Sequence, residues 1–335
     1  MKAVIHTKYG PPDVLRIKEL ESPHPKEDEV LIEVRASAVS ATSAIFRRGN
    51  QAAARLFTGV FKPRSIIPGF ELAGEVVAVG RSVARFEVGD KVYGAMDHSG
   101  AHAEYVCMPE DGVLAPMPAN LTFEQAAAVC DGALTALPFL RDEAKVEAGQ
   151  SVLVNGAAGA IGTFAVQLAK YYGAEVTGVC SASNAALVEA LGADQVIDYN
   201  RADFAENEAA YDVIFDTVGK RSYAQCRRAL KPHGVYLSTV LSVSILLDML
   251  WTSRRRGKRA VFAATGMRPA RDRAEDLRFL KGLAEASRIE PVIDRYYPMD
   301  EVEDAHRYIE TGHKKGSLIL TLRPEAPRRR TSMSR

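Results

Sequence analysis

The run that decides the fold is Ser151-Val-Leu-Val-Asn-Gly-Ala-Ala-Gly-Ala-Ile-Gly-Thr-Phe-Ala-Val-Gln-Leu-Ala-Lys-Tyr-Tyr-Gly173, which encodes a strand, a glycine turn and a helix in succession. The apolar residues 152–154 predict a buried strand, and apolar residues at helical spacing after the turn predict a helix. Gly156 permits a tight turn, Gly159 lets the backbone approach a pyrophosphate, and Gly162 lets the helix pack closely on the sheet. The run predicts a dinucleotide-binding turn; the alternative is a strand–helix turn whose glycines serve packing alone.

The backbone of this turn supplies the predicted phosphate contacts. A helix N-terminus carries unpaired N–H groups and the positive end of the helix dipole, and both favour a bound phosphate. We therefore expect five residues of the turn to contact a cofactor: Gly156, Ala158, Gly159, Ala160 and Ile161.

Length and composition restrict the class of protein. The 335 residues are enough for about two domains, each with its own core. With 25% charged residues and a net charge of +1, no bulk electrostatic argument favours nucleic acid as a partner. The four cysteines are far apart in the sequence, which fits a reduced cytoplasmic setting. The N-terminus turns polar at Thr7, too early for the apolar core of a signal peptide, so we expect a cytoplasmic protein.

The sequence changes character along the chain. Short β-runs split by glycine and proline fill residues 2–115 and predict an irregular antiparallel barrel. From residue 151 strands and helices alternate, which predicts a parallel doubly wound sheet. Strands are expected at 151–155, 175–180, 195–198, 211–216, 234–240 and 260–264, and helices at 160–172, 184–191, 222–230 and 273–286. A last strand–helix–strand pattern covers residues 291–322.

We therefore predict an α/β protein in which a nucleotide-binding domain is inserted into a barrel domain, with a cleft between the two. The barrel domain is expected to span residues 1–120 and to be completed by 288–322. The nucleotide domain is expected to span 121–287. The polar, basic segment 323–335 predicts a disordered tail.

The apolar segment 235–251 is followed by the basic residues Arg254, Arg255, Arg256, Lys258 and Arg259. The segment contains polar side chains and falls short of the roughly 20 residues of a membrane span, so we expect a core strand followed by an apolar loop or helix. An apolar segment beside basic residues could rest on an anionic membrane surface. The alternative, which we favour, is a solvated basic loop beside a pocket or subunit contact.

These features together resemble the medium-chain dehydrogenase/reductase superfamily, in particular its zinc-free quinone oxidoreductase (zeta-crystallin-like) branch. The resemblance covers nearly the whole chain. It rests on the glycine turn and on the segments 36–49, 68–80, 86–94, 131–136, 191–199 and 312–316. It implies a GroES-like β-barrel catalytic domain, a Rossmann nucleotide domain, and a homodimer paired through the nucleotide domains.

The ligands of a catalytic zinc are missing from this chain. Zinc-dependent members of the superfamily carry Gly-His-Glu where this chain has Phe70 between Gly69 and Glu71, and a cysteine ligand near residues 39–49, where this chain has none. A catalytic zinc needs three protein ligands, so we expect no metal. An alternative metal site could use Asp97, His98 and His102, which lie near one another in the sequence. We expect these three to be ordinary loop residues at the barrel surface instead.

The second strand of the nucleotide domain indicates the cofactor. NAD-binding folds place Asp or Glu at the end of this strand, roughly 20 residues past the glycine turn. Here the strand ends in Cys180-Ser-Ala-Ser-Asn184, without a carboxylate to repel a 2′-phosphate. Ser181 and Ser183 are expected to donate hydrogen bonds to that phosphate, and the resemblance implies the same for the hydroxyl of Tyr199. We therefore predict NADPH.

Other cofactor contacts are expected at the carboxyl ends of the parallel strands, where ligands of doubly wound sheets bind. The candidates are Val218, Leu237, Phe262 and Ala263, although apolar residues there also fit the core of the sheet. The resemblance adds Lys315, in a segment that lies close to the cofactor in the family.

Four hydroxyl side chains are candidates for the reacting end of the site. Ser40 and Ser43 stand where the branch often has Asn and Asp; they can donate a hydrogen bond but cannot act as a carboxylate base, and alternatively they only end a strand. Thr135 resembles the family's threonine beside the nicotinamide, or bonds a carbonyl of its own helix. Tyr93 is a candidate proton donor or an interior tyrosine of a strand.

Without a metal to polarise its oxygen, a simple ketone is a poor hydride acceptor, whereas a quinone or α,β-unsaturated carbonyl delocalises the added charge. The protein then mainly orients a small-molecule substrate in a dry pocket. This argument and the resemblance predict a zinc-independent, NADPH-dependent oxidoreductase that transfers hydride to quinones or α,β-unsaturated carbonyls. The alternatives are a zinc-free alcohol or carbonyl dehydrogenase and a non-catalytic NADPH-binding protein.

Overall fold

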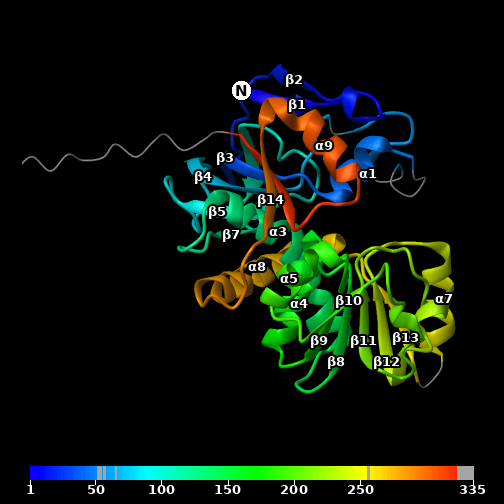
Figure 1. Cartoon of the computed structure of the whole chain (residues 1–335). Coiled ribbons are helices and arrows are strands. Elements are labelled where there is room, and N and C mark those ends of the chain that lie inside the picture. Colours follow the sequence, from blue (N-terminus) through cyan, green and yellow to red (C-terminus); the bar gives the residue numbers. More distant parts are fainter. Residues whose placement is uncertain (51–54, 56–57, 65, 255–256, 323–335) are drawn as a thin grey trace, which may run out of the picture.

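A computed structural model describes residues 1–50, 55, 58–64, 66–254 and 257–322 (Figure 1). The chain forms two large sheets, one above the other in Figure 1, with helices around and between them. The tail predicted at residues 323–335 lies outside the described residues. The α/β class with a barrel sheet and a doubly wound parallel sheet is confirmed.

The alternating half of the sequence forms a six-stranded sheet in the order β10-β9-β8-β11-β12-β13. All of its pairings are parallel. Its strands are β8 (Ser151–Asn155), β9 (Glu175–Cys180), β10 (Gln195–Asp198), β11 (Tyr211–Asp216), β12 (Leu230–Ser238) and β13 (Arg259–Phe262). Its helices are α4 (Ala160–Tyr171), α5 (Ala185–Ala190), α6 (Tyr223–Cys226) and α7 (Val243–Ser253). The strand order reverses between β8 and β11, which is where ligands of such sheets bind.

Four of the six predicted strands have the expected limits. The strand predicted at 260–264 spans 259–262, and the larger error lies around β12. The predicted strand at 234–240 begins at Leu230 and ends at Ser238, and the predicted helix at 222–230 is a single turn. Leu230 pairs with Tyr211, and the register shifts before the next pairs form. Leu230 is thus held by a partner on another strand, and local periodicity cannot reveal this pairing.

The other half of the chain forms a seven-stranded sheet. Its main path is β14-β15-β3-β4-β5-β7, and β6 pairs with β3. The strands are β3 (Glu29–Ala38), β4 (Glu71–Val79), β5 (Lys91–Ala95), β6 (Tyr105–Pro109), β7 (Leu114–Pro116), β14 (Ile293–Pro298) and β15 (Ser317–Thr321). β15 runs antiparallel to β3, so the C-terminal segment joins the sheet built by the N-terminal third of the chain. The exact domain limits at 120/121 and 287/288 stay a prediction.

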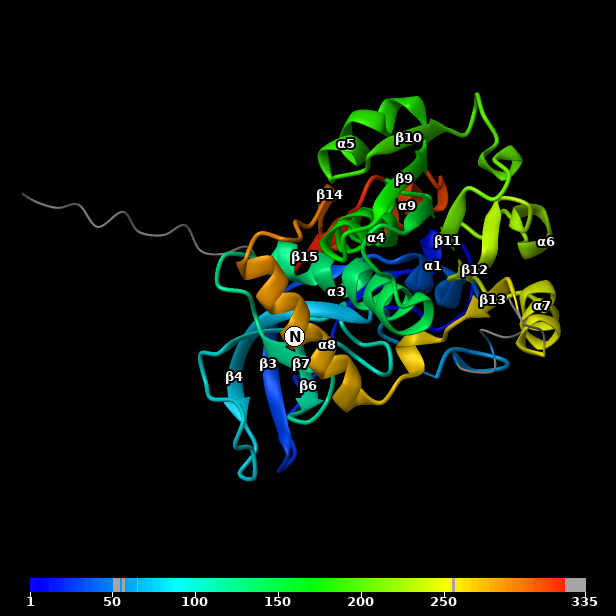
Figure 2. The same cartoon turned by 90° about the horizontal axis from the view of Figure 1, so that it is seen from below.

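Two long helices lie where the sheets meet: α3 (Phe123–Pro138) and α8 (Ala270–Glu285) (Figures 1 and 2). α3 packs on β3, β4 and β15 of one sheet and on α4 of the other half. α8 is attached to the barrel sheet by the hydroxyl of Tyr93, which donates to the Leu277 carbonyl at 2.5 Å, and by an ion pair of Arg273 with Asp97 at 2.8 Å. The two halves are therefore joined by packed helices rather than by a single linker.

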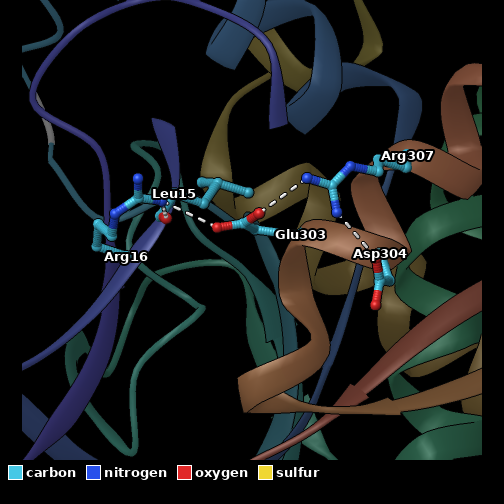
Figure 3. A network of polar contacts seen from close by, with 5 residues as sticks. All are labelled: Leu15, Arg16, Glu303, Asp304 and Arg307. Atoms are coloured by element: carbon cyan, nitrogen blue, oxygen red, sulfur yellow. Dashed lines mark hydrogen bonds and ion pairs between the residues drawn. The ribbon is translucent and has the colours of Figure 1, made fainter. Parts of the chain in front are cut away.

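The N-terminal hairpin of β1 (Lys2–Ile5) and β2 (Arg16–Glu19) lies against the C-terminal helix α9 (Val302–Glu310) (Figure 3). Arg16 donates to the Leu15 carbonyl at 2.6 Å and to Glu303 at 2.9 Å. Arg307 donates to Glu303 at 3.0 Å and to Asp304 at 2.9 Å. Exposed pairs of this kind contribute about 1 kcal/mol or less each, so the network orients α9 more than it stabilises it.

The apolar segment at 235–251 forms the end of β12 and most of α7, as expected from its pattern. Among the described residues, none of the helices has the length and apolar character to cross a membrane.

Three histidines are buried between α9, β1 and the first helix, α1 (Ala41–Arg48): His6, His102 and His306. His102 Nε2 lies 3.1 Å from the Ala38 carbonyl, and His306 Nδ1 lies 3.3 Å from Nε of Arg47, whose charge is paired with Glu310. Burial lowers the pKa of all three imidazoles, that of His102 to about 4, and the nearby Arg47 acts in the same direction on His6 and His306. The three rings are therefore neutral near pH 7.

We expect the protein to lose stability as the pH falls from 7 to 5. The unfolded chain protonates these histidines near pH 6.5 and the folded chain does not, so protons favour unfolding. His102 alone, with its pKa of about 4, accounts for about 2 kcal/mol over this range. Denaturant titrations at pH 7 and 5 measure the loss. His102→Gln, which keeps a donor for Ala38, should reduce the loss, and His24→Gln at an exposed position should not; equal pH dependence in both variants would contradict this.

Candidate nucleotide and substrate site

The glycine turn has the backbone that a dinucleotide requires. Gly156 follows β8 with a φ of 85°, and a Cβ there would lie 2.6 Å from Thr217 Oγ1. A Cβ at Gly162 would lie 2.1 Å from the Gly156 carbonyl oxygen, so α4 packs directly on the turn. Both glycines are required by the fold itself.

Gly159 differs from these two glycines. Its φ is −80°, and a Cβ there would meet only the Gly156 oxygen, at an ordinary 3.4 Å. It is the N-cap of α4 and has no side chain to accept from the first amides of the helix, at Ala160 and Ile161. The open space and the uncapped helix N-terminus fit a phosphate. The carbonyl of Ala158 is already used, since it accepts from Gly316 N at 2.8 Å.

A buried carboxylate organises the edge of the sheet beside this turn. Asp216, at the end of β11, accepts from Asn155 Nδ2 at 2.9 Å, from the amides of Val218 and Gly219 at 3.0 and 3.1 Å, and from the Tyr236 hydroxyl at 2.9 Å. Sequence reasoning missed Asn155 and Asp216, although each is a polar residue that ends an apolar strand. Their bonds hold the turn after β11 in place.

Two valines are exposed at this carboxyl edge. Val218 follows β11 and is 42% exposed, and Val240 follows β12 and is 40% exposed. They are neighbours, because a Cβ on Gly219 would lie 2.5 Å from Cγ2 of Val240. Val218 was predicted as a cofactor contact and Val240 was not. Together they offer an apolar surface at the switch point of the sheet.

The other predicted strand-end contacts divide into two groups. Leu237 is fully buried in the core, so the sheet-core alternative describes it and its side chain is not available to a ligand. Phe262 and Ala263 are half-buried, and the Phe262 amide lies 3.3 Å from the sulfur of Met249 under α7. Leu237 lies one residue before the end of β12 at Ser238, so its side chain is still inside the sheet.

The residues predicted to hold a 2′-phosphate lie together. Ser181 and Ser183 place their hydroxyl oxygens 3.0 Å apart just after β9. The Tyr199 amide donates to the Cys180 carbonyl at 3.2 Å, and its side chain is 55% exposed. Asp198, the register partner of Cys180, accepts from the Asn200 amide at 3.0 Å. The two serine hydroxyls and the backbone of Tyr199 therefore lie together at the end of β9.

The segment at 312–316 lies beside the glycine turn. Gly316 and Gly159 form an isolated parallel bridge. Lys315 is exposed next to this bridge, and its amide donates to Asp294 Oδ2 at 3.0 Å. The structure thus brings Lys315 near the turn, as the prediction requires.

Thr135 is the one predicted catalytic residue that is not buried. From residue 126 to residue 140 every residue except Thr135 is buried. One turn earlier, Gly132 approaches α4 so closely that a Cβ would lie 2.3 Å from the Ala160 carbonyl oxygen. Among the described residues, none forms a hydrogen bond with the Thr135 hydroxyl. Thr135 thus lies one turn along α3 from the contact of Gly132 with Ala160.

Ser40 and Ser43 are both used by α1. Ser40 is the N-cap and accepts from the Ser43 amide at 3.3 Å, while the Ser43 hydroxyl donates to the Ser40 carbonyl at 2.7 Å. Both side chains are buried. The alternative that both serines serve the ends of local elements therefore accounts for them. The Ser40 hydroxyl only accepts in this pair, so its own proton is still available to donate.

Tyr93 lies away from the candidate site. Tyr93 is fully buried, and its hydroxyl donates a hydrogen bond to the Leu277 carbonyl of α8. Burial raises the pKa of the phenol well above its usual value, which opposes loss of the proton. The interior-tyrosine alternative describes Tyr93, and the geometry argues against the proton-donor role.

Phe70, which replaces the histidine of zinc-dependent relatives, packs edge-on against Phe46 of α1 with ring centroids 5.5 Å apart. The alternative metal ligands have other partners: Asp97 pairs with Arg273, and the buried His102 contacts the Ala38 carbonyl. In the described ranges, no group of three metal-binding side chains occurs.

A cluster of buried charges lies where β4, α3 and the segment at 312–316 meet. Burial, and then the nearby Asp131, raise the pKa of Glu71 to about 8. Burial lowers the pKa of Lys314, and Asp131, Asp294 and Glu71 oppose this effect. Asp131 accepts from Ser317 Oγ at 2.9 Å, and Lys314 donates to the Gly316 carbonyl at 2.7 Å. Sequence reasoning missed these positions, because the cluster joins residues far apart in the chain.

Comparison with known proteins agrees with this geometry. Residues 26–119 match the family model of the alcohol dehydrogenase GroES-like domain, and residues 191–320 match that of the zinc-binding dehydrogenases. A 2-methylene-furan-3-one reductase of Solanum lycopersicum is 34% identical, over 96% of this chain and 79% of that protein. A chloroplastic NADPH-dependent alkenal/one oxidoreductase of Arabidopsis thaliana is 32% identical, over the same shares. The structure of Escherichia coli quinone oxidoreductase complexed with NADPH superposes with a TM-score of 0.82 at 26% identity, over 96% of this chain and 100% of that one.

Gly159→Ala should weaken NADPH binding without unfolding the protein. The added methyl group has room in the folded chain but enters the space expected for the pyrophosphate. We expect the Kd for NADPH to rise about tenfold, which corresponds to about 1.4 kcal/mol, and the melting temperature to change little. Gly162→Ala is the matched comparison, because its methyl group would clash with the Gly156 oxygen and should cost about 1–3 kcal/mol of stability. Unchanged NADPH affinity in Gly159→Ala would contradict the assignment.

Proposed function

The chain belongs to the medium-chain dehydrogenase/reductase superfamily, in its quinone oxidoreductase branch, and we propose that it is a zinc-independent, NADPH-dependent reductase of quinones and α,β-unsaturated carbonyls. The observation that carries the proposal is the position of Thr135. It is the one residue of 126–140 that is not buried, and it lies one turn from the contact between Gly132 of α3 and Ala160. The related reductases named above act on compounds of this class.

The described residues fit NADPH. The first amides of α4 and the open space at Gly159 suit the pyrophosphate. Ser181, Ser183 and Tyr199 would hold the 2′-phosphate, and no carboxylate stands at 180–184 to repel it. Val218 and Val240 would lie against the nicotinamide end. The bound cofactor supplies the hydride.

Aromatic and hydroxyl side chains of the barrel half suit a conjugated substrate. Phe46 and Phe70 form an apolar contact where a metal ligand stands in zinc-dependent relatives. A quinone or enone spreads the added charge over its conjugated system, and a hydrogen bond to its oxygen is then sufficient stabilisation. Thr135 is the first candidate donor, and Ser40, through its remaining proton, is the second. A hydrogen bond from either hydroxyl to the substrate oxygen requires no metal ion.

Three further expectations are part of this proposal. The barrel domain spans residues 1–120 with 288–322, and the nucleotide domain spans 121–287. The protein forms a homodimer through its nucleotide domains, as the resemblance implies, and it acts in the cytoplasm.

The proposal is tested by following NADPH and NADH absorbance with ortho- and para-quinones, alkenals and saturated aldehydes, each with and without a chelator. Turnover of the conjugated substrates with NADPH, insensitive to the chelator, is expected. Turnover of saturated aldehydes would favour a carbonyl dehydrogenase. Saturable NADPH binding without any turnover would favour a binding protein.

Thr135→Val should lower kcat about tenfold or more and leave the KM for NADPH within about twofold. The substitution removes one hydrogen-bond donor while it preserves the shape of the side chain, and a lost hydrogen bond of this kind costs about 1–3 kcal/mol. Thr135→Ser, which restores the hydroxyl, should recover most of the activity. If Val and Ser at this position give the same kcat, the hydroxyl has no role.

Ser181→Asp should shift the preference from NADPH toward NADH. The new carboxylate repels the 2′-phosphate and can accept from a ribose hydroxyl. We expect the ratio of kcat/KM values for the two cofactors to change on the order of 100-fold. Ser181→Ala, which only loses one hydrogen bond, should change the ratio much less. Equal ratios in the Asp and Ala variants would show that the 2′-phosphate binds elsewhere.

A further inference from the structure

Asp216, the last residue of β11, is a buried carboxylate without a cationic partner. Its side chain is fully buried. Among the described residues, no lysine, arginine or histidine lies within ion-pair distance of it, and Arg221, which follows β11, is paired with Asp203 at 2.9 Å instead. A buried charge without a counter-charge destabilises a fold. Stability alone therefore does not account for an aspartate at this position.

The hydrogen bonds around Asp216 stabilise its charged form but do not require it. Its Oδ1 accepts from Asn155 Nδ2 and from two backbone amides of the turn after β11, and three N–H donors on one oxygen favour a charged carboxylate. The Oδ1 of an asparagine would accept from the same three groups. Asp216 Oδ2 lies 2.9 Å from the hydroxyl of Tyr236, whose single proton can also bond the Arg221 carbonyl at 2.7 Å. An asparagine Nδ2 would donate to that hydroxyl and leave its proton for the carbonyl. An asparagine would thus satisfy the whole network without a charge.

The order of the parallel strands places the nicotinamide end of the cofactor beside Asp216, and this step rests on the proposed function. The strands stand in the order β9-β8-β11-β12. The proposed function puts the 2′-phosphate at the end of β9 and the pyrophosphate at the glycine turn after β8. Neighbouring strands are about 4.8 Å apart, so a dinucleotide that crosses the carboxyl edge in this direction has its remaining end over β11 and β12. The exposed Val218 and Val240 follow these two strands.

We propose that the charge of Asp216 stabilises the oxidised cofactor relative to the reduced one and so makes bound NADPH a stronger hydride donor. Hydride transfer moves two electrons and one proton together from the neutral dihydronicotinamide ring to the substrate, and it leaves the ring with one positive charge. A fixed negative charge near the ring favours this product, and it acts strongly where water is excluded. An asparagine, with the same hydrogen bonds, would lack this effect.

The ratio of two dissociation constants isolates this effect. Asp216 also repels the phosphates of the cofactor, but these are the same in NADP⁺ and NADPH, so their contribution cancels in the ratio of the two Kd values. Only the charge of the ring differs between the two forms. A variant that merely disturbs the site weakens both forms and leaves the ratio unchanged.

The test is calorimetric titration of the full-length protein with NADP⁺ and with NADPH, in the absence of substrate. Asp216→Asn should raise the ratio of the Kd for NADP⁺ to the Kd for NADPH about tenfold. Its melting temperature should not fall, because the hydrogen bonds are kept and an unpaired buried charge is removed. An unchanged ratio in Asp216→Asn would overturn the proposal.

Asp212→Asn is the matched control for the loss of one negative charge. Asp212 lies near the amino end of the same strand, where it accepts from Lys231 Nζ and from the Ser151 amide, both at 2.8 Å. Its replacement should leave the ratio within about twofold, since the charge is distant from the carboxyl edge and already paired. An equal change in both variants would assign the effect to net charge rather than to the position of Asp216.

Tyr236→Phe separates the charge from the hydrogen-bond network. This variant loses the hydroxyl that faces Asp216 Oδ2 and keeps the carboxylate. If the charge is responsible, Tyr236→Phe should leave the ratio of the two Kd values within about twofold. A change as large as that in Asp216→Asn would show that the network sets the ratio, and the proposal would be wrong.

A neutral analogue provides a measurement that needs no variant. Replacing the pyridinium ring of NADP⁺ by a benzamide ring keeps its shape and removes its positive charge. The natural protein should bind NADP⁺ more tightly than this analogue, and equal or tighter binding of the analogue would contradict the role of Asp216 even if Asp216→Asn did not fold. Absence of saturable NADPH binding to the natural protein would reject the proposed function itself, whereas normal binding with an unchanged ratio in Asp216→Asn would reject this inference alone.

Discussion

The close contact between Gly132 of α3 and the backbone of Ala160 sets the distance between the two sheets. Any side chain at Gly132 would collide with the Ala160 carbonyl, so only glycine permits this approach. Because α3 also packs on β3, β4 and β15, the same contact positions the glycine turn relative to the barrel sheet. The same contact fixes the position of Thr135, which lies one turn further along α3. Asp131 of α3 also accepts from Ser317 Oγ of β15 at 2.9 Å, which ties α3 to the C-terminal strand.

The parallel sheet was predictable because its strands are short apolar runs that glycine turns separate. The strands at 151–155, 175–180, 195–198 and 211–216 have the predicted limits. β12 was not predictable in detail, because Leu230 belongs to it through a pairing with Tyr211 on another strand. The return of residues 288–322 to the barrel half was predicted, but the pairing of β15 with β3 was not, because nothing local in either strand encodes it.

The candidate site shows the same division. Gly159, Ser181, Ser183 and Tyr199 could be chosen from the sequence, because a turn or strand end near them has a known chemical task. Ser40 and Ser43 could not be judged in this way, since a hydroxyl that caps a helix and one that meets a substrate look alike in a sequence. The roles of Asp216 and Glu71 arise from partners distant in the chain, which a single sequence does not reveal.

The antiparallel pairing of β3 with β15 also has a consequence for the order of folding during synthesis. Residues 36–38 of β3 leave the ribosome early, but their partners at 319–321 are among the last of the described residues to emerge. The parallel sheet, whose strands lie within 151–262, is complete well before then. Since domains fold as units during translation, the nucleotide half can fold first, and residues 29–33 of β3 can already pair with β6, whereas residues 36–38 must wait for β15.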